Sequence, residues 1–289
     1  MIDNFTYYLK YEKRASVHTL TAYITDLKQF EAFCQKNKPD FLLQDTLFGD
    51  IRAWMVDLIN QKIEPRSINR KMASLRTFFK FLQTQGILTD NPTQKVKPLK
   101  VSKCLPIFVK PDEMKQLLKK TTFESSKDPL LHQLILELMY GTGMRLSELI
   151  NLQIHNINLQ SKTIKVLGKR KKERIIPISD VVVEMISKYL EIRQKSQESC
   201  LLLTEKGEPL YPMFVQRLTK EYLRKVSSVE RKSPHILRHT YATHLLEEGA
   251  DLNSIKELLG HSSLAATQVY THTSLEKLKK VYRNAHPKA

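Results

Sequence analysis

Two segments near one end of the chain, SPHILRHTYATHLL (233–246) and LLGHSSLAATQVYTH (258–272), decide the fold together with GTGMRLSEL (141–149) upstream. In each segment apolar residues recur at helical spacing, with polar residues at fixed positions between them. This pattern predicts a mainly helical fold. The polar groups are cations, imidazoles and a phenol, without a cluster of carboxylates. They are Arg145, His235, Arg238, His261 and Tyr270. Such a set is suited to stabilising a reacting polyanion without a metal ion.

The composition predicts a globular, basic protein. The chain has 289 residues, enough for one or two domains, and is 41% hydrophobic and 27% charged. Its formal net charge of +17 indicates a nucleic-acid or anionic-membrane partner, but charge alone fits a merely basic protein about equally well.

The cysteines and the hydropathy bound the location. Three scattered cysteines without a CxxC pair indicate neither a disulfide framework nor a thiolate zinc site. We expect no signal peptide and no membrane span, because no apolar run approaches ~20 residues. The expected location is therefore cytoplasmic and, for a DNA-acting protein, nucleoid-associated.

Residues 1–97 are predicted to form a helical domain. Ser16 is suited to cap one helix, and a second begins after Pro65. The inner face of the second helix is apolar: Ile68, Met72, Leu75, Phe79 and Leu82. Its outer face carries Arg66, Asn69, Arg70 and Arg76. Such a face is usually only solvated, but no acidic residue interrupts it between 66 and 80, which favours contact with DNA phosphates.

The rest of the chain is predicted to be a linker, 98–106, and a second domain, 107–289. The stretch 91–106 is rich in proline and lysine and lacks helical periodicity. Short strands are expected at 163–167 and 174–178, joined by a basic tip, GKRKKE. Helices are expected at 131–140, where GTG (141–143) breaks the first, and at 181–197, 212–225, 236–248, 251–259 and 264–270.

Breaking a phosphodiester with a tyrosine makes three chemical demands. A phenol with a pKa of about 10 needs nearby cations or a base to attack at neutral pH. The non-bridging oxygens gather charge, which forked arginines can clamp. The departing 5′ oxygen needs a proton donor.

The catalytic segments, with VLGKRKKERIIPI (166–178), resemble the tyrosine recombinases, and look closest to the Xer-type site-specific recombinases and related phage or transposon integrases. The resemblance covers nearly the full chain, including TLTAYITDLKQF (19–30), RSINRKMASLRTFFKFL (66–82) and the HPKA ending. It implies a mainly α fold, with an N-terminal helical, SAM-like core-binding domain and a C-terminal catalytic domain, helical with a small antiparallel sheet.

The resemblance also implies residue roles. Arg145 would clamp the phosphate, supported by Glu148. His235 and Arg238 would contact the same phosphate, with His235 also placed for proton transfer. Two further residues complete the set, with His261 donating to a non-bridging oxygen and Tyr270 forming the 3′-phosphotyrosine.

The hairpin departs from the family pattern. The family usually has GKGNKER where this chain has GKRKKER. Lys169 holds the family position of the general acid, and we favour it. Lys171 and Lys172 remain alternatives for that role and are expected to contact DNA.

The resemblance implies no cofactor and no metal. His235, His239 and His244 superficially suggest a zinc helix, but HExxH is absent. The implied substrate is double-stranded DNA with paired half-sites, recombined through a Holliday junction by a homo-tetramer or a hetero-tetramer with a related recombinase. An activating protein is a further partner that the sequence leaves open. The tail after Tyr270, with Leu275, Leu278 and Val281, is expected to be exchanged between protomers.

Three functions stay open beside Xer-like chromosome dimer resolution or segregation. They are mobile-element or phage integration, type IB topoisomerase-like relaxation, and architectural DNA binding without catalysis. The short N-terminus, with no arm-binding domain apparent, favours the Xer-type role.

Overall fold

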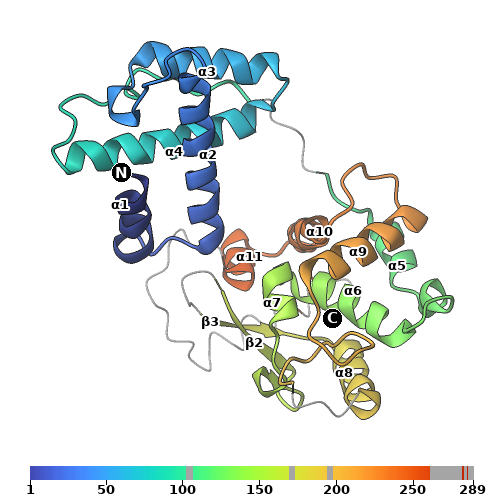
Figure 1. Ribbon diagram of the computed structural model, residues 1–289. Helices are drawn as coiled ribbons and strands as arrows, with labels where there is room; N and C mark the ends of the chain where they lie inside the picture. The colour runs from blue at the N-terminus through green and yellow to red at the C-terminus, as the bar shows by residue number, and fades with distance from the viewer. Residues whose placement is uncertain (102–106, 169–172, 194–197, 261–281, 283–284, 286–289) are drawn as a thin grey trace. The chain divides into compact units, whose positions relative to one another are not determined.

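The computed structural model describes residues 1–101, 107–168, 173–193 and 198–260, together with Tyr282 and Ala285. The chain divides into two compact units, Met1–Cys104 and Leu105–Ala289 (Figure 1). Within the described ranges the units are mainly helical, and the second carries one three-stranded antiparallel sheet. The expected fold class is confirmed. No helix in those ranges is long and apolar enough to cross a membrane.

The first unit is a helical cluster. Its α-helices are α1 (Ile2–Tyr7), α2 (Val17–Gln35), α3 (Phe48–Asn60) and α4 (Pro65–Thr84), with a π-helical turn at Tyr8–Glu12 and a 3-10 turn at Leu43–Asp45. Ser16 caps α2 by accepting from the Thr19 amide at 3.2 Å, and Pro65 opens α4, both as predicted. All five residues of the predicted inner face of α4 are buried. They pack with Phe5, Phe30 and Trp54 in the core of this unit.

A buried carboxylate ties α2 to α4. Asp26, only 1% exposed, accepts from both terminal nitrogens of Arg70 at 2.6 and 3.1 Å. It also accepts from Lys71 Nζ at 3.0 Å and from Ser74 Oγ at 2.7 Å. Charge-assisted bonds of this kind satisfy a carboxylate that burial would otherwise make costly.

The second unit is built around α6 (Pro129–Thr142), which packs against α8 (Asp180–Ile192), α9 (Pro212–Val226) and α10 (Pro234–Glu247) (Figure 1). The other helices are α5 (Pro111–Leu117), α7 (Leu146–Ile150) and α11 (Leu252–Leu259), with 3-10 turns at Lys120–Phe123 and Ile154–Asn156. Asp128 caps α6 by accepting from the Leu131 amide at 3.0 Å, and Asp251 caps α11 by accepting from Ser254 at 3.0 Å.

The sheet has the order β1-β2-β3, with β1 (Ile157–Asn158), β2 (Thr163–Leu167) and β3 (Glu173–Pro177). In the β2–β3 hairpin, Val166 pairs with Arg174 and Ile164 with Ile176. The predicted hairpin is confirmed to within one residue, whereas the two-residue β1 was not predicted. A strand that short has no alternating pattern to detect.

The predicted break at GTG is confirmed, because α6 continues to Thr142 and ends at Gly143 in the left-handed conformation, φ 59°. One helix prediction was wrong at its end. The helix predicted to reach 197 ends at Ile192, since Arg193 is extended and donates to the Glu198 and Cys200 carbonyls. The helix predicted at 264–270 lies outside the described residues.

Candidate active site

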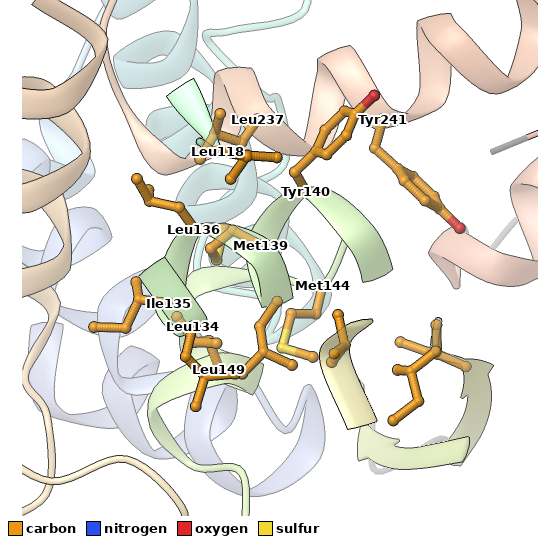
Figure 2. Packing of buried hydrophobic residues seen from close by; sticks show 14 of the residues in the cluster. Leu118, Leu134, Ile135, Leu136, Met139, Tyr140, Met144, Leu149, Leu237 and Tyr241 are labelled. Atoms are coloured by element: carbon orange, nitrogen blue, oxygen red, sulfur yellow. The ribbon is translucent and has the colours of Figure 1, made fainter. Parts of the chain in front are cut away.

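The turn between α6 and α7 presents Arg145. Helix α6 ends at Gly143, and Arg145 is the N-cap residue of α7. Met144 and Leu149, which precede and follow Arg145, are both buried. Figure 2 shows Met144 and Leu149 in the same apolar cluster as Leu134 and Met139 of α6. Two buried side chains on either side of Arg145 therefore fix the backbone from which its guanidinium extends.

Glu148 holds Arg145 in two ways. Its Oε2 accepts from the Arg145 backbone amide at 2.7 Å, and its Oε1 accepts from Arg145 NH1 at 2.8 Å. The carboxylate caps α7 and orients the guanidinium at the same time. The Arg145 side chain keeps 29% exposure, whereas that of Glu148 is 2% exposed. An anion can thus reach Arg145 but not its support.

Arg238 of α10 lies beside this turn. Its NH1 donates to the Gly143 carbonyl at 2.5 Å and its NH2 to the Leu259 carbonyl at 2.6 Å. A side chain at Gly143 would obstruct this arrangement, because a Cβ there would lie 2.4 Å from the Tyr241 ring. The close packing of Gly143 on α10 brings Arg238 to the end of α6. In Figure 2, Tyr241 of α10 and Tyr140 of α6 lie next to each other above the cluster.

Three arginine side chains donate hydrogen bonds to the carbonyl groups at the C-terminal end of α11. The carbonyls of Leu258, Leu259 and Gly260 accept respectively from Arg174 at 2.8 Å, Arg238 at 2.6 Å and Arg145 at 3.1 Å. These groups carry the negative end of the helix dipole, so cations are favoured there. His261, the next residue in the chain, lies outside the described residues.

Arg174 is a residue that the sequence reasoning missed. It lies in β3, is 3% exposed, and donates to both oxygens of Glu148 at 2.7 and 2.8 Å. A signal was present, because Arg174 alternates with Ile176 and Ile178 on the inward face of the strand. A charged residue at an inward position indicates a buried partner.

The cluster of arginines around Glu148 carries a surplus of positive charge. Burial, with the positive charges of Arg145 and Arg174, lowers the pKa of Arg238 to about 10. Burial would raise the pKa of Glu148, but the bonds and charge of Arg174, with those of Arg145, outweigh it and hold the pKa at about 2. Three guanidiniums thus surround one carboxylate, and the surplus of positive charge favours a bound phosphate.

The histidines of α10 have different surroundings. His235 and His239 are exposed, and His235 precedes Arg238 by about one helical turn, so both lie on one side of α10. His244 is buried, and its Nδ1 lies 2.9 Å from the Tyr140 hydroxyl, which makes it a structural residue. Among the described residues no three His, Cys, Asp or Glu side chains are grouped as metal ligands.

Comparison with known proteins identifies the family. The sequence matches the Phage integrase family over residues 108–277 and its N-terminal SAM-like domain over residues 2–86. The chain belongs to the phage integrase family of tyrosine recombinases. It is an enzyme of the tyrosine-type site-specific recombinase class, and the resemblance seen in the sequence is confirmed.

Similar proteins span the whole recombinase. Tyrosine recombinase XerC of Chlorobaculum parvum is 38% identical, over 100% of this chain and 94% of the relative. XerC of Staphylococcus carnosus is also 38% identical, over 99% and 97%. Two solved structures share the fold. XerH bound to difH in a pre-cleavage complex has a TM-score of 0.71 at 21% identity, covering 96% of this chain and 82% of XerH. The Tn1549 transposon integrase with transposon right-end DNA has 0.73 at 18%, covering 96% and 98%.

Several predicted site residues of the recombinase lie outside the described residues. They are Lys169, Lys171, Lys172, His261 and Tyr270. Their neighbours are described: β2 and β3 flank the hairpin tip, and α11 ends directly before His261. The roles implied for these five residues stay predictions.

The predicted DNA-contacting face of α4 has contacts of its own. Asn69 donates to the Leu99 carbonyl at 2.9 Å and accepts from the Leu99 amide at 2.8 Å. Arg76 donates to the Val96 carbonyl at 3.2 Å, and Arg70 is paired with Asp26. Arg66 is exposed. Two of the four residues therefore hold residues 96–99 against α4, and phosphate contact by the face stays a prediction.

The predicted domain limits and tail exchange are not tested by a single chain. The division of the chain into two units falls between Cys104 and Leu105, inside the predicted linker, but Leu99 is still hydrogen-bonded to Asn69 of α4. Tyr282 and Ala285, at 2% and 4% exposure, are buried in the core of the recombinase's own second unit. Exchange between protomers would have to replace this packing with the same packing from a neighbour. Leu275, Leu278 and Val281 lie outside the described residues.

Proposed function

We propose that the recombinase cuts and rejoins DNA through Tyr270, with Arg145 and Arg238 clamping the scissile phosphate. The observation that carries this proposal is the anchoring of both arginines on the final carbonyls of α11. Because both are held beside the segment that continues to His261 and Tyr270, the cations and the nucleophile are connected by a short length of chain.

The proposed reaction conserves the phosphodiester bond energy. The Tyr270 hydroxyl loses its proton as its oxygen attacks phosphorus, the bond from phosphorus to the 5′ oxygen breaks, and that oxygen takes a proton. We favour Lys169 as the donor, with His235 assisting proton transfer and His261 donating to a non-bridging oxygen. The product is a 3′-phosphotyrosine, which a 5′ hydroxyl of the partner duplex then attacks. The two guanidiniums stabilise the charge that gathers on the non-bridging oxygens.

In the cell we propose an Xer-like role in chromosome dimer resolution or segregation, in the cytoplasm and associated with the nucleoid. The full-length similarity to XerC proteins supports this role over phage or transposon integration. The proposed assembly is a tetramer on two duplexes, either of this chain alone or with a related recombinase. It exchanges strands through a Holliday junction, with or without an activating protein.

A suicide substrate tests the proposal. Such a substrate carries a nick near the cleavage point, so that cleavage releases a short fragment with the 5′ hydroxyl. Rejoining is then prevented, and the covalent complex accumulates. The wild-type protein should form an SDS-resistant adduct, whereas Tyr270→Phe should bind the DNA with unchanged affinity and form none. Persistence of the adduct in Tyr270→Phe would refute Tyr270 as nucleophile. Relaxation of supercoiled DNA without sequence preference would favour the topoisomerase alternative.

A further inference from the structure

Arg174 lies at the centre of the arginine cluster without access to DNA. Its side chain is 4% exposed, and its three described bonds go to protein groups: both oxygens of Glu148 and the Leu258 carbonyl. A phosphate outside the protein cannot reach such a buried guanidinium. Any effect of Arg174 on the reaction must therefore pass through its partners.

Those partners connect three parts of the unit. Through Glu148, Arg174 reaches the turn that presents Arg145. Through Leu258 it reaches the end of α11, where the next two carbonyls hold Arg238 and Arg145. Through its own strand it belongs to the hairpin whose tip carries Lys169, with Arg174 paired to Val166.

The packing beside Arg174 is close as well. Gly260 ends α11 in the left-handed conformation, φ 65°, and a Cβ there would lie 3.1 Å from Arg174 Cδ. The end of α11 thus rests directly on the arginine side chain. A shorter side chain would leave a gap between β3 and α11 and would lose the fork that matches the carboxylate.

We propose that Arg174 is a positioning residue of DNA cleavage, which fixes Glu148 and the end of α11 so that Arg145 and Arg238 meet the phosphate together. The inference rests on the proposed phosphate clamp. It differs from a purely stabilising ion pair, because Glu148 Oε1 accepts from Arg174 and Arg145 at once. Loss of Arg174 leaves Arg145 attached to a carboxylate that can turn.

Two variants separate positioning from stability. Arg174→Lys keeps the positive charge but cannot form the forked pair and the third bond together. Arg174→Gln removes the charge. The matched control is Arg193→Lys, since Arg193 also donates to two backbone carbonyls, at the end of α8. The melting temperature of each variant is measured first. Affinity for half-site DNA and single-turnover cleavage of the suicide substrate are then measured below that temperature.

We expect both Arg174 variants to bind half-site DNA within about threefold of the wild type, because Arg174 is not at the surface. Cleavage at saturating protein should fall about 10- to 100-fold, the loss that a misplaced catalytic group produces. Arg193→Lys should cleave at the wild-type rate. Should Arg174→Gln fail to fold, Arg174→Lys carries the test alone, and wild-type cleavage by Arg174→Lys would overturn the inference.

The pH dependence of cleavage gives a second readout. The charged groups facing Glu148 are Arg145 on its own turn, Arg174 from β3 and Arg238 from α10. Without Arg174, burial is offset by less positive charge, so Glu148 in Arg174→Gln should take up a proton at higher pH and release Arg145. Cleavage by this variant should then decline more steeply than that of the wild type as the pH is lowered.

Adding Glu148→Gln to Arg174→Gln should remove this additional decline. An identical pH profile in wild type and Arg174→Gln would show that Arg174 only stabilises the fold. Tyr270→Phe in the same assay keeps the two proposals distinguishable. If that variant still forms an adduct, the proposed nucleophile is wrong. If it forms none while Arg174→Lys cleaves normally, the nucleophile stands and the positioning role of Arg174 is refuted.

Discussion

Replacement of Gly143 by alanine should damage both the stability and the chemistry of the second unit. Gly143 has φ 59°, a conformation that costs an L-residue about 1–2 kcal/mol. Its new Cβ would also lie 2.4 and 2.8 Å from two atoms of the Tyr241 ring, and Tyr241 is fully buried. Overpacking of this kind adds about 1–3 kcal/mol. The two effects together predict a loss of about 2–5 kcal/mol in the free energy of unfolding.

Gly249→Ala is the matched control. Gly249 has φ 82°, but a Cβ there would meet nothing within 4 Å, so only the backbone cost of about 1–2 kcal/mol applies. Urea unfolding followed by near-ultraviolet circular dichroism compares the two variants in the full chain. Gly143→Ala should also cleave DNA more slowly than Gly249→Ala, because the Gly143 carbonyl accepts from Arg238. Equal destabilisation by the two substitutions would refute the steric argument.

Three further perturbations have defined outcomes. Asp26→Asn should lower the free energy of unfolding of the first unit by about 3–5 kcal/mol, because it leaves the buried Lys71 without its anion. Urea unfolding measures this loss, and a change below about 1 kcal/mol would contradict the buried ion pair. Asn69→Ala should speed hydrogen exchange of the Leu99 amide, which donates to Asn69 Oδ1, and an unaltered rate observed by NMR would show that residues 96–99 stay in place without it. Because the pKa of Glu148 is lowered from 4.5 to about 2 on folding, its stabilisation is complete above pH 4.5 and is lost as the pH falls towards 2. The advantage in stability of wild type over Glu148→Gln should therefore shrink by up to roughly 3 kcal/mol across that range, and a constant difference would mean that Glu148 is not the titrating group.

Much of the helical fold follows from local chemistry. Ser16 at an N-cap and Pro65 at a first helical position are residue types that typically begin helices. The inner face of α4 is recognisable because its apolar residues recur at helical spacing. The β2–β3 hairpin was predicted because short alternating segments flank a basic tip. An error occurred where contacts outside the helix accompany its end, at Arg193, whose side chain donates to the carbonyls of Glu198 and Cys200 in the following loop.

The site was predictable in its residue types but not in its support. Arg145, Glu148 and Arg238 were noticed because they are charged residues within apolar helical segments. The structure brings all three together. The anchoring carbonyls of α11 have no sequence signature, since every residue carries a carbonyl. For the same reason the bonds of Asn69 and Arg76 to residues 96–99 could not be seen in α4 alone. Polar residues on an outer face serve the protein's own chain as readily as a ligand.

Identification of the covalently bound residue tests the central claim most directly. The wild-type protein is trapped on a suicide substrate, the DNA is digested with nuclease, and the peptides are sequenced by mass spectrometry. We predict that the peptide containing Tyr270 carries a nucleotide through its 3′ phosphate and that the other tyrosine-containing peptides are unmodified. A nucleotide attached to any other residue, or through a 5′ phosphate, would contradict the account.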